Sequence, residues 1–163
     1  MAQAVYPLKQ VIEVKKKRVE DAEKLVLEKQ KVLEQEEKKL KEREADRDKA
    51  MSHHNAKLQQ LRDCLDEGTT SDKILQMKVY LKVTIERVKI EEKKVKDQQG
   101  QVEKASKDLQ MAQLELRMKR QEVDKLETHK KDWLKEMRKE EEVIEGREQD
   151  EIGTIIFSVK HKK

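Results

Sequence analysis

The sequence contains little of what a compact globular domain needs. Its 163 residues include one Pro, four Gly and only four aromatic side chains, so the turn chemistry of a sheet protein is missing. The single Cys64 excludes an internal disulfide and a cysteine-based metal site. With 34% hydrophobic and 45% charged residues, the chain is left with two classes, a disordered polyelectrolyte or long helices.

Long apolar segments are also absent. No stretch approaches the roughly 20 apolar residues that cross a bilayer, and the first twenty residues carry Lys9 and the basic cluster 15–18 instead of an apolar signal-peptide core. The 39 Lys and Arg are interleaved with 35 Asp and Glu, which argues against nucleic acid as the main partner. We therefore expect a cytoplasmic protein with no transmembrane segment.

Apolar residues recur every seven positions, which favours helices over disorder. In the first half the predicted seam runs from Ile12 to Leu40, takes an eleven-residue step to Met51, and resumes through Leu58 and Leu65. In the second half the step of seven continues without interruption, and ten of its eleven positions are apolar. These are Ile74, Leu81, Val88, Val95, Val102, Leu109, Leu116, Val123, Met137 and Ile144.

A turn signal separates the two halves. Gly68 can end a helix in the left-handed conformation, and Thr70 or Asp72 can cap the helix that follows. The predicted organisation is a single all-α domain, an antiparallel two-helix coiled-coil hairpin with unequal arms. Its predicted parts are a lead-in at 1–7, a first helix at 8–65, a turn at 66–72, a second helix at 73–150 and a flexible tail at 151–163.

The predicted pairing can be checked by arithmetic. A turn near Thr70 pairs residues whose numbers add up to about 139, which sets Leu58 against Leu81 and Leu65 against Ile74. The second helix then extends beyond the start of the first. An apolar surplus at that open end suggests a docking surface, unless the lead-in with Val5 and Tyr6 covers it. The surplus residues are Trp133, Leu134, Met137, Val143 and Ile144, and the docking candidates at this end are Tyr6, Leu8, Trp133, Leu134 and Met137.

Nothing in the pattern indicates catalysis or a cofactor. His53 and His54 are adjacent on a helix and diverge, so we expect no metal site, and His54 falls on the seam as a core histidine. Cys64 is expected to serve packing. No glycine-rich phosphate loop is present, and the basic cluster 15–18 is expected to form a solvated helix face.

Three short stretches resemble a known family in their exact residue order and not only in their heptad spacing. They are Tyr6-Pro7-Leu8 at the first helix start, Arg18 to Lys24 (RVEDAEK), and Asp66 to Asp72 (DEGTTSD) at the turn. With them the chain resembles the type III secretion family called YscO or SctO, in particular its chlamydial members, from end to end. The family is similar to the flagellar protein FliJ and to the coiled coil of the rotary ATPase gamma subunit.

The resemblance implies a non-enzymatic stalk. Such a protein inserts into the hexameric secretion ATPase, couples it to the export gate at the inner membrane, and in several systems binds secretion chaperones or the needle-length regulator. By this analogy the open-end residues are the ATPase-docking candidates, and Met77 and Tyr80 near the turn are the export-gate candidates, with core packing as their alternative role. The competing interpretation of the whole chain is a scaffolding coiled coil that self-associates, whereas we expect a monomeric hairpin.

Overall fold

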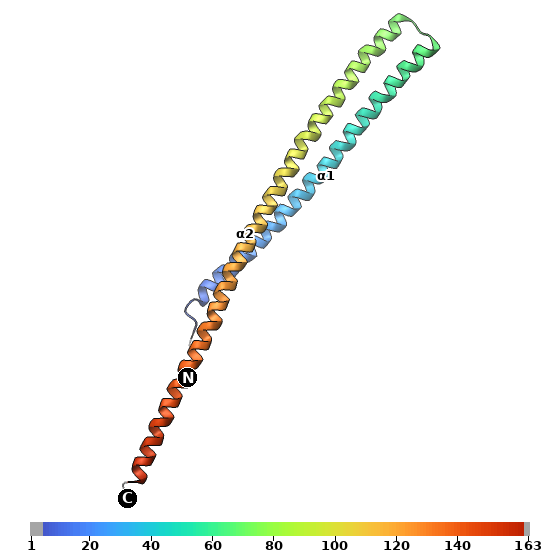
Figure 1. Ribbon diagram of the computed structural model, residues 1–163. Coiled ribbons are helices and arrows are strands. Elements are labelled where there is room, and N and C mark those ends of the chain that lie inside the picture. Colours follow the sequence, from blue (N-terminus) through green and yellow to red (C-terminus); the bar gives the residue numbers. More distant parts are fainter. Residues whose placement is uncertain (1–4, 162–163) are drawn as a thin grey trace. The chain divides into compact units, whose positions relative to one another are not determined.

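The computed structural model describes residues 5–161 and folds them into two α-helices (Figure 1). Helix α1 comprises Lys9–Glu67, and helix α2 comprises Ser71–Lys160. The described residues contain no strand. The predicted all-α hairpin with unequal arms is therefore confirmed, since α1 has 59 residues and α2 has 90.

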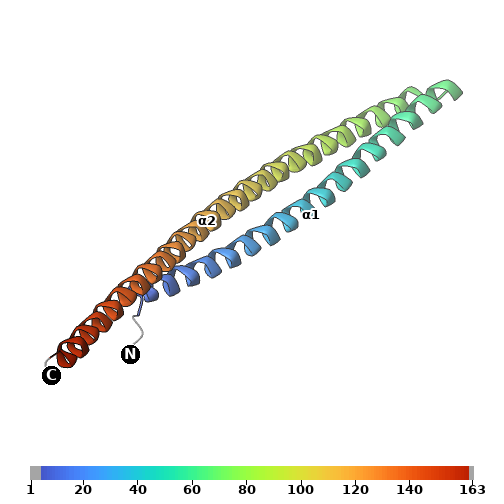
Figure 2. The ribbon, with the colours of Figure 1, turned by 60° about the horizontal axis from the view of Figure 1, so that its bottom comes forward.

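The chain divides into two packed units. Unit 1 combines the chain up to Glu23 with the chain from Leu114 onward, and unit 2 comprises Lys24–Gln113 with the turn. Within unit 2, the α1 and α2 segments run antiparallel on either side of the turn (Figures 1 and 2). Within unit 1, the start of α1 likewise packs antiparallel against α2, because Tyr6 contacts Trp133 while Glu23 contacts Arg120.

Each unit buries a narrow apolar seam instead of a broad core. The most buried side chain is Val88 in unit 2, which is 1% exposed. From Ile74 to Met137 every seventh residue of α2 is buried or half-buried, as the uninterrupted step of seven predicts. The other buried apolar residues are Ala50, Leu61, Val95, Ala105 and Ala112 in unit 2, and Tyr6, Ile12, Ala22, Leu116 and Val123 in unit 1.

The predicted eleven-residue step in α1 is not needed to continue the seam, although Met51, the predicted point of resumption, is half-buried. The heptad continues from Leu40 through Arg47 and His54, which are half-buried, to Leu61, which is 7% exposed. Leu65, predicted to lie in the seam, is 50% exposed. Because Arg47 and His54 are polar, the apolar pattern looks interrupted there, although the heptad spacing of the seam continues. Of the other predicted seam residues near the turn, Leu58, Ile74 and Leu81 are half-buried.

The turn between the helices lies at the predicted place but is shorter than the predicted 66–72, because α1 continues to Glu67 and α2 begins at Ser71. Gly68 has φ of +86°, a left-handed conformation that a side chain disfavours. Helix α2 begins one residue after Thr70, whose carbonyl accepts from Ile74 N–H at 3.2 Å. Asp72 lies in the first turn of α2, where its negative charge complements the helix dipole.

Both outer ends differ from the prediction. Helix α1 begins at Lys9, whose N–H donates to the Tyr6 carbonyl at 3.2 Å. Helix α2 does not end at 150 but continues through Gly153 to Lys160, and Thr154 Oγ1 donates to the Asp150 carbonyl at 2.8 Å. A helical glycine costs only about 1 kcal/mol, which the surrounding helix can absorb. The remainder of the predicted tail, 162–163, and of the lead-in, 1–4, lies outside the described residues.

Neither helix has a segment that is long and apolar enough to pass through a membrane, judged over the described residues.

Candidate docking surfaces

The lead-in of unit 1 is anchored by an aromatic cluster. Tyr6 is 5% exposed, and its ring meets the ring of Trp133 edge-on at a centroid distance of 5.4 Å. Its hydroxyl forms a 2.6 Å hydrogen bond with His129 Nδ1. Because the hydroxyl finds a polar partner, the Tyr side chain can be buried at the edge of a charged helix pair. The predicted docking residue Tyr6 thus faces Trp133 rather than solvent.

Ion pairs connect the two segments of unit 1 beside this cluster. Lys15 Nζ lies 2.6 Å from Glu122 Oε2, and Lys16 Nζ lies 2.8 Å from Glu127 Oε1. The hydrogen bond from Lys15 lowers the pKa of Glu122 below its usual value, and Lys16 does the same for the pKa of Glu127. These pairs are solvent-exposed, so they specify alignment more than they add stability.

Apolar side chains of unit 1 remain accessible around and beyond the aromatic cluster. Leu8 and Leu134 are each 37% exposed, whereas Trp133 and Met137 are half-buried. Further along α2 the large apolar residues are between 53% and 65% exposed. They are Val143, Ile144, Ile152, Ile155, Ile156, Phe157 and Val159. Carboxylates accompany them, with eight Asp or Glu against three Lys or Arg over 136–151. This surface is therefore apolar and acidic.

Unit 2 contains a polar layer where the apolar seam is interrupted. His54 Nδ1 lies 2.8 Å from the hydroxyl of Thr84, which is 5% exposed. That hydroxyl donates its only proton to the Leu81 carbonyl at 2.9 Å. The buried hydroxyl of Thr84 therefore has two polar partners, the Leu81 carbonyl and His54 Nδ1. The predicted core histidine is confirmed, with its partner identified.

A second polar layer joins Glu36 to Gln98 in the same unit. Gln98 Nε2 donates to Glu36 Oε2 at 2.5 Å and to the Glu36 carbonyl at 3.1 Å. A hydrogen bond from Lys39, followed by the one from Gln98, lowers the pKa of the Glu36 carboxyl. Hydrogen bonds across the seam fix which residues face each other more sharply than aliphatic contacts do.

The export-gate candidates lie beside a shallow pocket of unit 2. Met77 is half-buried and Tyr80 is 45% exposed, and both line this pocket with Lys57, Gln60 and Gln76. The Tyr80 hydroxyl is hydrogen-bonded to His53 Nε2 at 3.0 Å, and the Lys57 ammonium lies 5.8 Å from the Tyr80 ring centroid. Tyr80 is held in place at the surface, which suits a contact residue.

No set of three or more His, Cys, Asp or Glu within 5–161 is arranged to hold a metal ion. Cys64 is a free, half-buried thiol. Sequence reasoning missed two structural groups: the Glu36–Gln98 pair and the partner of His54. Strict counting by seven from Ile12 also places His54 on the seam, but it does not identify Thr84 as its partner. It would not have found Glu36, which lies in the companion row three residues after Leu33.

Comparison with known proteins agrees with the fold. The family model described as "YscO-like protein" matches residues 3–163. A putative YscO homolog, CT670 from Chlamydia trachomatis, has a solved structure that is 46% identical, covers 99% of each chain and superposes with a TM-score of 0.94. A Chlamydia pneumoniae structure of a CdsV and CdsO protein complex contains a chain that is 52% identical, covering 52% of this chain and 98% of that one, with a TM-score of 0.49.

A search of curated protein sequences finds no match. The family model and the Chlamydia trachomatis homolog each extend over nearly the whole chain, and they agree with each other. The chain belongs to the YscO-like family and is a component of a type III secretion system.

Proposed function

We propose that this chain is a non-enzymatic cytoplasmic stalk that binds the secretion ATPase through unit 1 and the export gate through unit 2. Family membership supports this proposal, because the resemblance to FliJ and to the gamma subunit implies a coiled coil held by an ATPase ring. Secretion chaperones and the needle-length regulator are further partners that the family resemblance implies.

The observation that carries the ATPase contact is the apolar and acidic surface of unit 1. Trp133 packs against Tyr6, whose hydroxyl is in turn hydrogen-bonded to His129, so Trp133 presents its remaining surface in a fixed orientation. Leu134 and Met137 lie one and four residues further along the same helix. A preorganised aromatic residue beside aliphatic ones is typical of interface hot spots, since little side-chain entropy is lost on binding. In this proposal Tyr6 is the anchor and Trp133, Leu134, Met137 and Leu8 are contacts.

ATP turnover by the cognate secretion ATPase tests this contact. We expect the wild-type protein to stimulate turnover, and Trp133→Ala and Met137→Ala to reduce the stimulation severalfold. Leu114→Ala is the matched control, because Leu114 is a 56% exposed aliphatic residue of the same unit outside the proposed contact. Absence of stimulation by the wild type would refute the coupling role. Full stimulation by both variants would refute only the choice of residues.

The gate contact is carried by Met77 and Tyr80. The hydrogen bond to His53 and the nearby Lys57 ammonium orient the Tyr80 ring while leaving 45% of the residue accessible. Binding of the purified cytoplasmic part of the cognate export-gate protein should weaken at least fivefold in Tyr80→Ala. Tyr80→Phe should bind nearly as the wild type if the ring, rather than its hydroxyl, makes the contact. If Tyr80→Ala binds the export-gate protein as tightly as the wild type, the gate contact lies elsewhere on this chain.

The molecular mass in solution distinguishes the stalk from the competing function, a self-associating scaffold. A monomeric stalk keeps the mass of one chain in sedimentation equilibrium from micromolar to hundreds of micromolar concentration, whereas a scaffold shows a mass that rises with concentration.

A further inference from the structure

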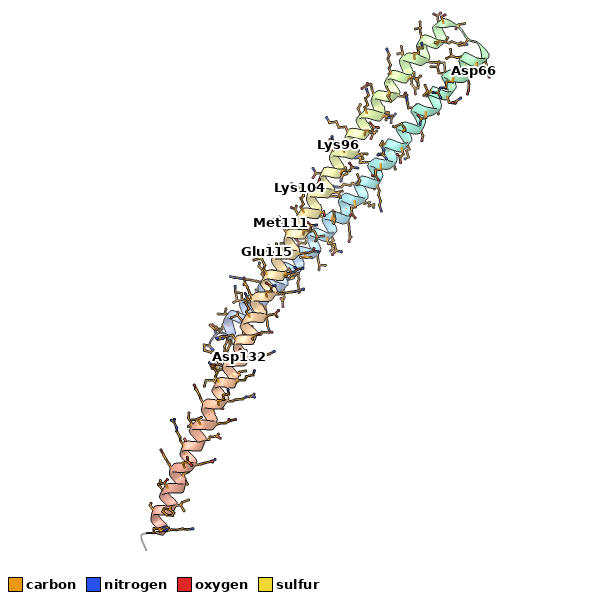
Figure 3. The ribbon with its side chains drawn as sticks, viewed as in Figure 1. Asp66, Lys96, Lys104, Met111, Glu115 and Asp132 are labelled. Atoms are coloured by element: carbon orange, nitrogen blue, oxygen red, sulfur yellow. The ribbon has the colours of Figure 1, made fainter. Side chains whose placement is uncertain are left out.

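Helix α2 of unit 2 carries a second apolar row besides its seam. Leu75, Val79, Val83 and Ile90 are 55% to 61% exposed. At 3.6 residues per turn they share one side of the helix, whereas seam residues such as Val88 lie roughly opposite. We call these four residues the outer stripe. In Figure 3 Lys96, Lys104 and Met111, which belong to the same outward side, lie on the flank of α2 turned away from α1.

Lysines run beside the outer stripe. Between Lys73 and Lys96 there are eight Lys or Arg and three Glu, a net charge of +5 on a chain whose total is +4. Lys78, Lys82 and Lys89 recur at intervals of four and seven, so they form one border of the stripe. Of the three, Lys89 is paired, to Glu86 at 3.0 Å. The stripe is therefore mainly apolar, is interrupted by Glu86, whose charge pairs with Lys89, and is positive along one edge.

We propose that the outer stripe binds an acidic amphipathic helix of a partner protein. Aliphatic side chains spaced by four, four and seven residues suit packing of a second helix along α2, because those spacings repeat on one helix face. The matching helix interleaves aliphatic residues with Asp and Glu at the same spacing, so each carboxylate meets a lysine of the border. This surface is separate from Met77 and Tyr80, which lie toward the seam and the His53 side of α2.

Two other occupants fit the outer stripe less well. A lipid surface is disfavoured because none of the four stripe residues is an aromatic side chain that could anchor at a membrane interface. The acidic end of α2 from a second copy is disfavoured because its charges and its aliphatic residues are separated. Its carboxylates end at Glu151, whereas five of its seven exposed apolar residues follow at 152–159.

A synthetic helix of about 22 residues tests the proposal, since that length covers the stripe and its lysines. The probe repeats aliphatic residues at the first and fourth positions of each heptad with Glu at the flanking positions. A second probe has Lys in place of every Glu. We expect the full-length protein to bind the Glu probe at low micromolar concentration in fluorescence anisotropy, and the Lys probe at least tenfold more weakly.

Variants locate the binding on the protein. Val79→Ser with Val83→Ser, and separately Lys82→Glu with Lys89→Glu, should each weaken binding of the Glu probe tenfold or more. Leu27→Ser is the matched control, because Leu27 is a 59% exposed aliphatic residue of α1 in the same unit. Leu27→Ser should bind the Glu probe as tightly as the wild-type protein does. Circular dichroism should show unchanged helix content in all three, because every substituted residue is solvent-exposed.

Several results would overturn the proposal. Equal binding of the two probes, or undiminished binding by either double variant, removes the acidic helix as occupant. Sedimentation that shows self-association of the wild type but not of Val79→Ser with Val83→Ser assigns the stripe to a second copy. Capture by vesicles containing phosphatidylserine, lost in Lys82→Glu with Lys89→Glu, assigns it to lipid. Stimulation of the ATPase stays intact in these variants, so failure here is distinguishable from failure of the stalk function.

Discussion

Replacing Tyr6 by Ala should release the lead-in from unit 1. The ring of Tyr6 is buried against Trp133 and His129, and its hydroxyl shares a 2.6 Å hydrogen bond with His129 Nδ1. Truncating a buried aromatic side chain to Ala costs about 3 to 5 kcal/mol in a closed core, and we expect the lower end at this one-sided site. Of this, about 1 kcal/mol belongs to the hydrogen bond.

Trp133 supplies the assay, because it is the one Trp in the sequence. Loss of the edge-on contact hydrates its indole, so the emission maximum of Tyr6→Ala should move to longer wavelength in the absence of denaturant. The urea midpoint that Trp133 reports should fall as well. Tyr6→Phe should keep the emission maximum and lose about 1 kcal/mol of stability.

Val5→Ala is the control for the fluorescence assay, since Val5 is 74% exposed and its truncation removes little buried surface. It should leave both the emission maximum and the urea midpoint unchanged. The reasoning is refuted if Tyr6→Ala has the emission maximum and the midpoint of the wild-type protein.

Glycine substitutions should have opposite signs at two sites. Gly68→Ala should lower the free energy of unfolding by about 1 to 2 kcal/mol, because φ of +86° is unfavourable for Ala, although no atom lies within 4 Å of the added Cβ. Gly100→Ala should raise the free energy of unfolding by about 0.5 to 1 kcal/mol, since Gly100 is helical with free space around it. A change of the same sign for both variants in urea denaturation would contradict this reasoning. A further prediction concerns acid. Because the pKa of Glu122 is lowered in the folded state, its pairing with Lys15 stabilises the fold at pH values above the unfolded-state pKa. This stabilisation is lost as the pH falls through the folded-state pKa. Lys15→Met should therefore move the NMR titration of Glu122 back toward its usual pKa and reduce the loss of stability below about pH 4.5, and an unchanged titration would refute the pairing.

The sequence predicts the helices well because their pattern is repetitive and local. Ten aliphatic residues in α2 at intervals of seven leave little choice of face, and Gly68 marks a position where the chain must adopt positive φ. The sums of paired residue numbers agree too. His54 with Thr84 gives 138, and Tyr6 with Trp133 gives 139, close to the predicted value.

The α1 seam near the turn could not be predicted as securely. Arg47 and His54 occupy half-buried seam positions there, and a polar residue in the seam looks like a break in the apolar pattern unless its partner is known. Hydrogen bonds between residues 30 or 62 positions apart, such as those of Thr84 and Gln98, have no local signal. The outer stripe is similarly hidden in the sequence, because its four aliphatic residues alternate with seam residues until burial separates the two rows.

The docking residues cannot be identified from heptad periodicity alone. Periodicity indicates that apolar residues exceed the available partners at one end of α2, but it does not tell which of them are covered. Tyr6 illustrates this: a hydrophobic residue outside the helix folds back onto Trp133 and changes from contact to anchor. Which partner meets the remaining surface is a question of the partner's chemistry.

The fold-back of α2 onto α1 is the claim on which every proposed surface depends, and a disulfide tests it most directly. His54→Cys and Thr84→Cys, placed together in a Cys64→Ser chain, exchange the 2.8 Å side-chain contact between His54 and Thr84 for two thiols. The control moves the second cysteine by one residue to Val83, which is 61% exposed and faces outward. We predict that oxidation closes a loop within single chains for the first pair, at a yield independent of dilution, and not for the control. Covalent dimers as the main product of the first pair would contradict the fold.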